Sequence, residues 1–198
     1  MKHLLKSVKS FTIKSSSPSA VKDNTEGRLE VMTSQQKSYL AGLLDGDGSI
    51  MLQLKPQKDM KLLFRVKAVV ILYQDNRYHQ ELLKLQKLIG HGYVYQRNDH
   101  MSELRLEGFT CVRQFLSEIK PYIRFKQKQV EYMLRAVEIG LKRKQTIANF
   151  LALCRFSDKI AQCNYSSKRR VYSALYVLKL LKKHNLVPVT TGFPTKSG

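Results

Sequence analysis

A nine-residue segment, residues 40–48, limits what this chain can fold into more than any other part of the sequence. Upstream of it, Thr33-x-x-Gln36 fits a helix-capping box, and leucines at helical spacing follow. A glycine just past the last periodic residue usually ends a helix, so we expect this helix to stop at Gly46 or Gly48. Two aspartates therefore lie at the C-terminal end of a predicted helix.

These aspartates, Asp45 and Asp47, face the negative end of the helix dipole, which costs roughly 0.3–1 kcal/mol for each carboxylate. A bound cation would reverse that cost. In the same helix, Ala41 and Gly42 leave room for another backbone to approach closely, as small residues do at helix interfaces. The segment thus predicts both a cation and a helix partner.

Two other interpretations of the acid run fit less well. An EF-hand loop would need Asp or Asn at its fifth position, Gly at its sixth and Glu at its twelfth, but those positions hold Ser49, Ile50 and Pro56. Asp-Gly pairs also mark plain turns. A plain turn, however, leaves the small-residue helix upstream unexplained.

Strand and helix patterns alternate along the chain. Apolar and polar residues alternate over residues 50–55 and 64–73, which predicts a long β-hairpin with its turn within residues 56–59. A second hairpin is predicted from the alternation at residues 93–97 and 103–106. Further helices are predicted at about residues 76–90, 109–118, 126–140, 145–162 and 168–184. This order predicts an α+β fold with an antiparallel sheet.

We expect one core domain at residues 34–141, a basic helical extension of the same domain at residues 142–186, and a tail at residues 187–198. Residues 1–33 form a basic N-terminal extension, which we expect to be disordered. The lysines and serine cluster of this extension resemble an organelle transit segment. A flexible basic tail explains the same composition equally well.

The charge of the chain points to a polyanionic partner. Lys and Arg number 35 against 15 Asp and Glu, which leaves a formal charge of +20. Such a charge opposes compaction unless a polyanion neutralises part of it, and nucleic acid is the obvious candidate. Charge alone does not distinguish DNA from RNA.

The remaining composition excludes several classes of site. The three cysteines form no C-x-x-C pair, so neither a disulfide framework nor a zinc site is indicated, and free thiols are expected. The five histidines lack metal-ligand spacing. No apolar stretch approaches the ~18 residues of a membrane span, so we expect no membrane partner.

The segment at residues 40–48 resembles the signature of the LAGLIDADG homing endonucleases. It matches that signature at seven of nine positions, with Leu44 in place of isoleucine and Gly46 in place of alanine. Only one copy is present, so the resemblance is to the single-motif, homodimeric branch found in introns of algal organelle genomes. It extends over about residues 35–165, through residues 90–94 and 119–129. It implies an αββαββα core whose saddle-shaped antiparallel sheet lies on the major groove of double-stranded DNA.

The resemblance also implies site-specific cleavage of both DNA strands with Mg²⁺ at a long pseudo-palindromic target. The metal ligands would be the Asp47 carboxylate and the backbone carbonyl of Gly46, and dimerisation would bring two Asp47 side chains together. Hard oxygen ligands favour Mg²⁺. We expect Mn²⁺ to replace it, and Ca²⁺ to bind without supporting cleavage.

Of the other catalytic positions of the family, two have matching residues in this sequence and one does not. Gln74 and Lys126 match the places of a glutamine that positions solvent and a lysine that stabilises charge on the phosphate. A further basic residue of the family aligns with Tyr78, and we assign its role to the neighbouring Arg77.

By the same resemblance, outward side chains of the sheet would read bases. Arginine suits guanine, glutamine suits adenine, and Val69 or Ile71 suits thymine methyls. Each such residue fits an ordinary solvated strand equally well. The expected base contacts are Gln53, Lys55, Gln57, Arg65, Lys67, Val69, Ile71, Tyr93, Tyr95, Arg97, Glu103 and Arg105, and the expected phosphate contacts are Lys168, Arg169 and Arg170. The expected dimer contacts are Leu40, Ala41, Gly42, Leu43 and Asp45, with Asp45 tying either the helix end or the interface.

An alternative function is that of a maturase, an RNA-binding cofactor for splicing of the host intron. A chain that had abandoned cleavage could lose Asp47 freely, so its presence alongside Gln74 and Lys126 favours the nuclease. The same argument disfavours a DNA-binding regulator. An organelle-encoded protein of this type is expected in a chloroplast or a mitochondrion.

Overall fold

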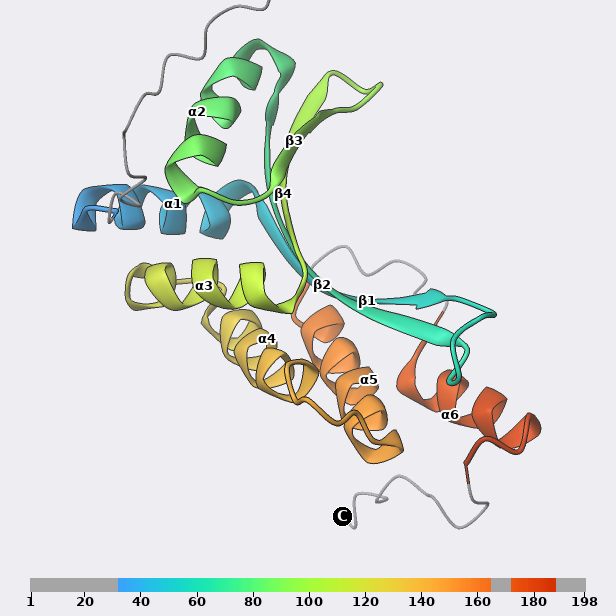
Figure 1. The fold of residues 1–198 in the computed structure, drawn as a ribbon. Coiled ribbons are helices and arrows are strands. Elements are labelled where there is room, and N and C mark those ends of the chain that lie inside the picture. Colours follow the sequence, from blue (N-terminus) through green and yellow to red (C-terminus); the bar gives the residue numbers. More distant parts are fainter. Residues whose placement is uncertain (1–31, 165–171, 188–198) are drawn as a thin grey trace, which may run out of the picture.

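The computed structural model describes residues 32–164 and 172–187. The strands are β1 (Gly48–Pro56), β2 (Phe64–Asp75), β3 (Tyr93–Gln96) and β4 (Met101–Glu107). The helices are α1 (Ser34–Asp47), α2 (His79–Ile89), α3 (Phe109–Ile119), α4 (Gln127–Gly140), α5 (Ile147–Gln162) and α6 (Ala174–Lys183), with 3₁₀ turns η1 (Asn76–Tyr78) and η2 (Lys120–Tyr122). This order confirms the predicted αββαββα core with added C-terminal helices (Figure 1). Residues 1–31, 165–171 and 188–198, which include Lys168, Arg169 and Arg170, lie outside the described residues.

Helix α1 begins and ends where its sequence predicts. The Thr33 backbone N–H donates to Gln36 Oε1 over 2.8 Å, and the Gln36 N–H donates to Thr33 Oγ1 over 3.3 Å, which completes the capping box. At the other end, the Gly48 N–H donates to the Leu44 carbonyl. Strand β1 starts at that same glycine, so no loop separates the acid run from the sheet.

The four strands form one antiparallel sheet in the order β1-β2-β4-β3. The second strand of each hairpin is therefore central, and the two hairpins lie side by side. Even-numbered side chains of β1 and β2 point to one face, where Ile50, Leu52, Val70 and Leu72 are buried. All the helices gather on that side of the sheet (Figure 1). The odd-numbered side chains form the opposite face, which we call the outward face.

Three element boundaries differ from the sequence prediction. The first hairpin turns over the seven residues Gln57 to Leu63 and not within residues 56–59, because Pro56 still pairs with Phe64. The predicted helix at residues 76–90 begins as the 3₁₀ turn η1. Helix α6 begins only at Ala174, where Ser173 caps it by accepting from the Tyr176 N–H over 3.1 Å.

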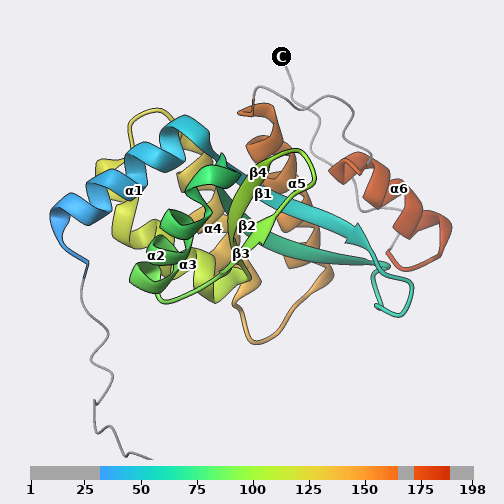
Figure 2. The ribbon, with the colours of Figure 1, turned by 90° about the horizontal axis from the view of Figure 1, so that it is seen from above.

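The C-terminal helices support the first hairpin. Helix α5 packs against α4 and β1. Ser157 Oγ donates to the Leu52 carbonyl, and Asn164 Nδ2 donates to the Ile50 carbonyl over 3.1 Å. These side chains satisfy carbonyls of β1, which is an edge strand of the sheet. Helix α6 lies beyond α5 near the hairpin tip (Figure 2), in a second apolar cluster that contains Leu54, Phe64, Phe150, Val177 and Leu178.

Cys111, Cys154 and Cys163 are free thiols. Within residues 32–164 and 172–187, no helix is long and apolar enough to cross a membrane.

The junction between α1 and β1 generates a stability prediction. At Gly48 an added Cβ would lie 2.6 Å from the Leu44 carbonyl oxygen and 2.7 Å from the Leu44 Cα. We therefore expect Gly48→Ala to lower the free energy of unfolding by about 1–3 kcal/mol, measured by urea denaturation. Gly46→Ala is the matched control, because nothing in the same subunit lies within 4 Å of a Cβ there and the signature that residues 40–48 resemble has alanine at this position. Alanine also favours a helix over glycine by about 1 kcal/mol. Equal losses in both variants would contradict the steric explanation.

Candidate active site

Asp45 ties the end of α1 to the start of α4. Its Oδ2 accepts from the backbone N–H groups of Arg124 over 2.6 Å and Phe125 over 3.2 Å, and its Oδ1 accepts from the N–H of Lys126 over 2.9 Å. Lys126 is the N-cap residue of α4 and makes no side-chain cap of its own. The carboxylate thus binds the segment that leads into α4, including the N–H of the N-cap residue, which has no partner within the helix. Asp45 thus ties the helix end, one of the two roles expected for it.

Lys126 is held beside both aspartates. Its Nζ donates to the Asp45 carbonyl over 2.6 Å. Partial burial lowers the pKa of Lys126, and the charges of Asp45 and Asp47 oppose that shift. The structure therefore brings two predicted catalytic residues, Asp47 and Lys126, within electrostatic reach of each other.

Asp47 and Gly46 are exposed at the end of α1. A pocket of about 770 Å³ adjoins this helix end, and its lining includes the cations Arg124, Lys126 and Lys128 together with Asp45 and Gly46. Its charge suits a phosphate group. Within the described residues, no cluster of three or more His, Cys, Asp or Glu side chains could hold a metal ion. One subunit offers Asp47 and nearby carbonyl oxygens, a donor set that fits a hard cation only as half of a site.

The structure places Gln74 and Arg77 differently. The ladder pair Gly48↔Leu72 brings the start of β1 to within two residues of Gln74, so Gln74 and Asp47 share one end of the sheet. Arg77 is 79% exposed and is bound by Asp75, whose Oδ1 accepts from the Arg77 N–H and Nε over 2.8 and 3.0 Å. Its guanidinium lies 5.9 Å from the ring centroid of Tyr78. These contacts hold Arg77 in the η1 turn and not against Asp47.

The outward face carries most of the expected base-reading residues. Those on its strands are Gln53, Lys55, Arg65, Lys67, Tyr93, Tyr95, Glu103 and Arg105, while Gln57 and Arg97 follow at strand ends. Tyr93 and Tyr95 are about half exposed. The buried Gln53 Oε1 has no hydrogen-bond partner among the described residues, which is uncommon for a buried polar atom.

Val69 and Ile71 correct one expectation. Both lie on the outward face of β2, but they are only 0% and 2% exposed. They pair with Met51 and Ser49 of β1 on one side and with Glu107 and Arg105 of β4 on the other. Strand β2 is central in the sheet, and the strands on both sides of it leave almost none of either side chain exposed. A thymine methyl therefore finds no free surface at either residue.

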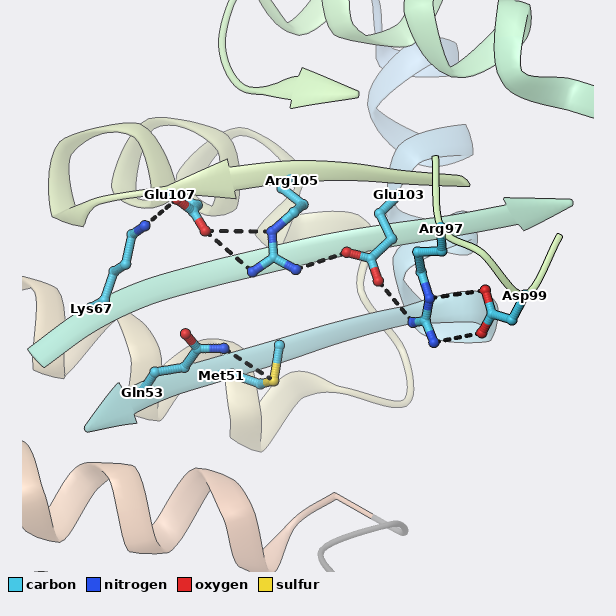
Figure 3. A network of polar contacts seen from close by, with 8 residues as sticks. All are labelled: Met51, Gln53, Lys67, Arg97, Asp99, Glu103, Arg105 and Glu107. Carbon is cyan, nitrogen blue, oxygen red and sulfur yellow. Dashed lines mark hydrogen bonds and ion pairs between the residues drawn. The ribbon is translucent and has the colours of Figure 1, made fainter. Parts of the chain in front are cut away.

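A line of alternating charges crosses the outward face (Figure 3). We call it the charge chain, and its members in order are Lys67, Glu107, Arg105, Glu103, Arg97 and Asp99. Arg105 donates to Glu103 over 2.7 Å and to Glu107 over 3.2 Å, and Lys67 is bound to Glu107 from the neighbouring strand. Arg97 donates to Glu103 over 2.8 Å and to Asp99 over 2.6 Å.

The neighbours of Glu107 and Arg105 in the charge chain shift the pKa values of these two residues. Burial alone would raise the pKa of Glu107, but hydrogen bonds from Lys67 and Arg105 outweigh burial and lower it. Burial would likewise lower the pKa of Arg105, but its bonds to Glu103 and Glu107 raise it. These groups therefore stay ionised together near neutral pH.

Sequence reasoning missed Glu107 and Asp99. Glu107 continues the alternation of Glu103 and Arg105 by one more step, so the period-two pattern contains the signal that finds it. Asp99 lies in the turn of the second hairpin, two residues after its partner Arg97, and no periodic pattern marks it.

The exposed surface of α1 corrects the expected dimer contacts. Leu40 and Ala41 are both 0% exposed because they face the subunit's own core. Helical spacing places Tyr39, Gly42 and Gly46 on the opposite side, where they are exposed, and Leu43 is half-buried. Nothing lies within 4 Å of a Cβ built at Gly42 or Gly46. The open stripe of α1 is therefore Tyr39-Gly42-Gly46.

Comparisons with known proteins agree with this architecture. The profile of the LAGLIDADG endonuclease family matches residues 40–139. The chain is 34% identical over 135 residues to DNA endonuclease I-CreI of Chlamydomonas reinhardtii, covering 68% of this chain and 82% of that protein. It is 30% identical over 146 residues to DNA endonuclease I-CvuI of Chlorella vulgaris, covering 74% and 89%. The crystal structure of I-CvuI with its target in the presence of 2 mM Ca has a TM-score of 0.73 at 29% identity, covering 78% of this chain and 97% of that one. I-CvuI has also been solved with the I-CreI target, uncleaved, in the presence of 2 mM Mg.

The mixed fold, the signature helix and the acid at its end define a protein of the homing-endonuclease class. This chain belongs to the LAGLIDADG endonuclease family.

The different contacts of the two aspartates generate a second prediction. Asp45→Asn places an amide nitrogen against backbone N–H groups, so we expect the free energy of unfolding to fall by about 1–2 kcal/mol. The exposed Asp47 makes no such bonds within the described residues, and Asp47→Asn should leave stability within about 0.5 kcal/mol of the wild type. Urea denaturation of both variants at one protein concentration measures the difference. A larger loss in Asp47→Asn than in Asp45→Asn would refute this division.

Proposed function

We propose that this protein is a site-specific endonuclease that cuts both strands of a long pseudo-palindromic DNA target. The observation that carries the proposal is the position of Asp47. It is exposed beside Lys126 at the end of α1, where the acid run enters the sheet without a loop. The outward face of that sheet presents amide, cationic and aromatic side chains, which suit base edges in the major groove. The relatives I-CreI and I-CvuI are named DNA endonucleases.

The proposed metal ligands are the Asp47 carboxylate and the Gly46 backbone carbonyl from each of two subunits. Both are hard oxygen donors, which Mg²⁺ and Mn²⁺ prefer. When bound, the metal would stabilise negative charge on the oxygens of the phosphodiester that is cut. We expect Ca²⁺ to occupy the site without supporting cleavage.

The chain's own residues supply the remaining functions in this proposal. Lys126 stabilises charge on the phosphate, and its bond to the Asp45 carbonyl holds it in place before DNA arrives. Gln74 orients water at the same end of the sheet. Arg77 is the expected further cation near the phosphate. To reach it, the Arg77 side chain would have to break its hydrogen bond to Asp75.

We infer that the active form is a homodimer joined through the open stripe Tyr39-Gly42-Gly46. Glycines on an exposed helix face permit a second helix to pack at short distance. Phe125, which is 84% exposed, lies beside this end of α1 because Asp45 binds its N–H. A large apolar side chain in this position favours burial against a partner. Two copies would bring two half-sites together and match a pseudo-palindrome.

A second candidate function is that of a maturase that binds the RNA of a host intron. Its support is the formal charge of +20, which suits either nucleic acid. The exposed Asp47 beside Lys126 favours the nuclease. We also propose an organelle location, in a chloroplast or mitochondrion, on the basis of the basic, serine-rich residues 1–33 and the algal origin of both relatives.

Asp47→Asn tests the proposed chemistry. We expect this variant to bind a selected target as well as the wild type does while cleavage in Mg²⁺ falls by at least about 100-fold, since a metal ligand is lost. Cleavage of a randomised pseudo-palindromic library identifies the target, and gel shift in Ca²⁺ measures binding. Glu81→Gln on α2 serves as the control, because it removes a carboxylate whose one ion pair among the described residues is with the exposed Lys84. Undiminished cleavage by Asp47→Asn would contradict the proposed role of Asp47 as a metal ligand.

The inferred dimer predicts a mass in solution. Light scattering at micromolar concentration without DNA should give twice the 22.9 kDa chain mass. Gly42→Leu should shift the mass towards one chain, because the new side chain fills the open stripe at a position where an added Cβ meets nothing within 4 Å in its own subunit. A single-chain mass for the wild type would contradict the dimer.

A further inference from the structure

The charge chain holds cations that would otherwise be free to bind any DNA. A lysine or arginine exposed towards the duplex binds backbone phosphates, and such contacts carry no sequence information. Lys67, Arg105 and Arg97 lie on the face proposed to meet DNA, yet each is bound by at least one carboxylate. The six members carry three positive and three negative charges, so the charge chain is neutral in a protein of charge +20.

Glu107 is the carboxylate that joins the two central strands of the sheet. It binds Lys67 of β2, and Arg105 of β4 through both Nε and Nη2. Its side chain is only 16% exposed, so the pairing is partly shielded from solvent. Glu103 closes the other side of Arg105 through Nη1. Arg105 is therefore fixed between two acids on its own strand.

We propose that Glu107 is a positioning residue for target specificity. By binding Lys67 and Arg105, it withholds both cations from phosphates and presents their remaining donors to base edges. The inference rests on the proposed DNA endonuclease function. It adds a role to a residue that lies outside the catalytic set.

The donor count permits this role. A guanidinium has five N–H groups, and Arg105 commits one each from Nε, Nη1 and Nη2. Two N–H groups remain, the number that a bidentate contact with guanine requires. Lys67 commits one of its three N–H groups to Glu107. A cation that is held in one position cannot turn towards a backbone phosphate. It can therefore bind only a base whose acceptors lie at that position.

The test is Glu107→Gln, which keeps the side-chain shape and removes its charge. Equilibrium binding to the selected target and to a scrambled duplex of equal length and composition is measured in Ca²⁺ over a range of salt concentrations. We expect the preference for the target to fall by about tenfold, comparable to the loss of one base-pair contact. For the scrambled duplex, we expect the slope of log affinity against log salt to steepen by about 1–2, since each new phosphate contact adds about 0.9.

Glu131→Gln is the matched control. Glu131 pairs with Arg135 on the exposed surface of α4, so this variant makes the same change in net charge away from the outward face. It should shift neither the preference nor the slope by the amounts expected for Glu107→Gln. Equal shifts in the two variants would show an effect of net charge alone and would overturn the proposal.

A second pair of variants does not depend on the folding of Glu107→Gln. If Glu107 withholds Lys67 from phosphates, Lys67→Met should leave the salt slope for the scrambled duplex unchanged. Lys55→Met, at an exposed position of the same face, should reduce that slope by about 0.9. A reduced slope in Lys67→Met would overturn the proposal.

Different results would overturn the proposed endonuclease function and the proposed role of Glu107. A wild type that neither cleaves nor prefers any duplex would overturn both. A wild type that selects and cleaves a target, together with an undiminished preference in Glu107→Gln, would overturn only the role of Glu107.

Discussion

The bond between the Asp45 carboxylate and three consecutive backbone N–H groups is the interaction on which the candidate site depends. The N–H groups of Arg124, Phe125 and Lys126 lie at the start of α4, and Asp45 lies at the end of α1, about eighty residues earlier in the chain. Hydrogen bonds from N–H groups to a charged carboxylate are stronger than those to a neutral acceptor. This contact sets the position of Lys126 relative to Asp47, and the Lys126 ammonium returns to the Asp45 carbonyl and closes the connection.

Asp45 and Asp47, the two aspartates at the end of α1, consequently differ in their contacts. Both face the negative end of the α1 dipole, which disfavours each of them. The hydrogen bonds of Asp45 offset that cost within the subunit, whereas Asp47 is exposed at the same helix end. The electrostatic cost that remains at Asp47 is what a cation would relieve. A chain that folds by means of Asp45 therefore leaves Asp47 exposed, as the proposed role of Asp47 as a metal ligand requires.

Local patterns predicted the elements well, whereas three-dimensional neighbours decided which side chains are available. The capping box at Thr33 and the glycine stop at Gly48 set α1 correctly, because both signals act within one helical turn. The inward direction of Leu40 and Ala41 depends on which side of α1 meets the sheet, and the spacing of apolar residues there is ambiguous. Val69 and Ile71 alternate as outward residues should, but burial on a sheet face is set by the strands on either side. The order of the helices and strands could thus be predicted from the sequence, whereas the exposure of individual side chains could not.

In this protein, the charges that attract any polyanion differ from those proposed to set the preference for one DNA sequence. The excess of positive charge, +20 over the whole chain, draws a polyanion without regard to sequence. Along the charge chain, by contrast, Glu103 and Glu107 each join two cations, so the charge of this part of the outward face is balanced locally. A balanced surface gains little from phosphates and gains from base edges only where donors and acceptors match. Residues that lower the total attraction can therefore raise the preference for one sequence, since specificity is a difference between two affinities and not the size of either.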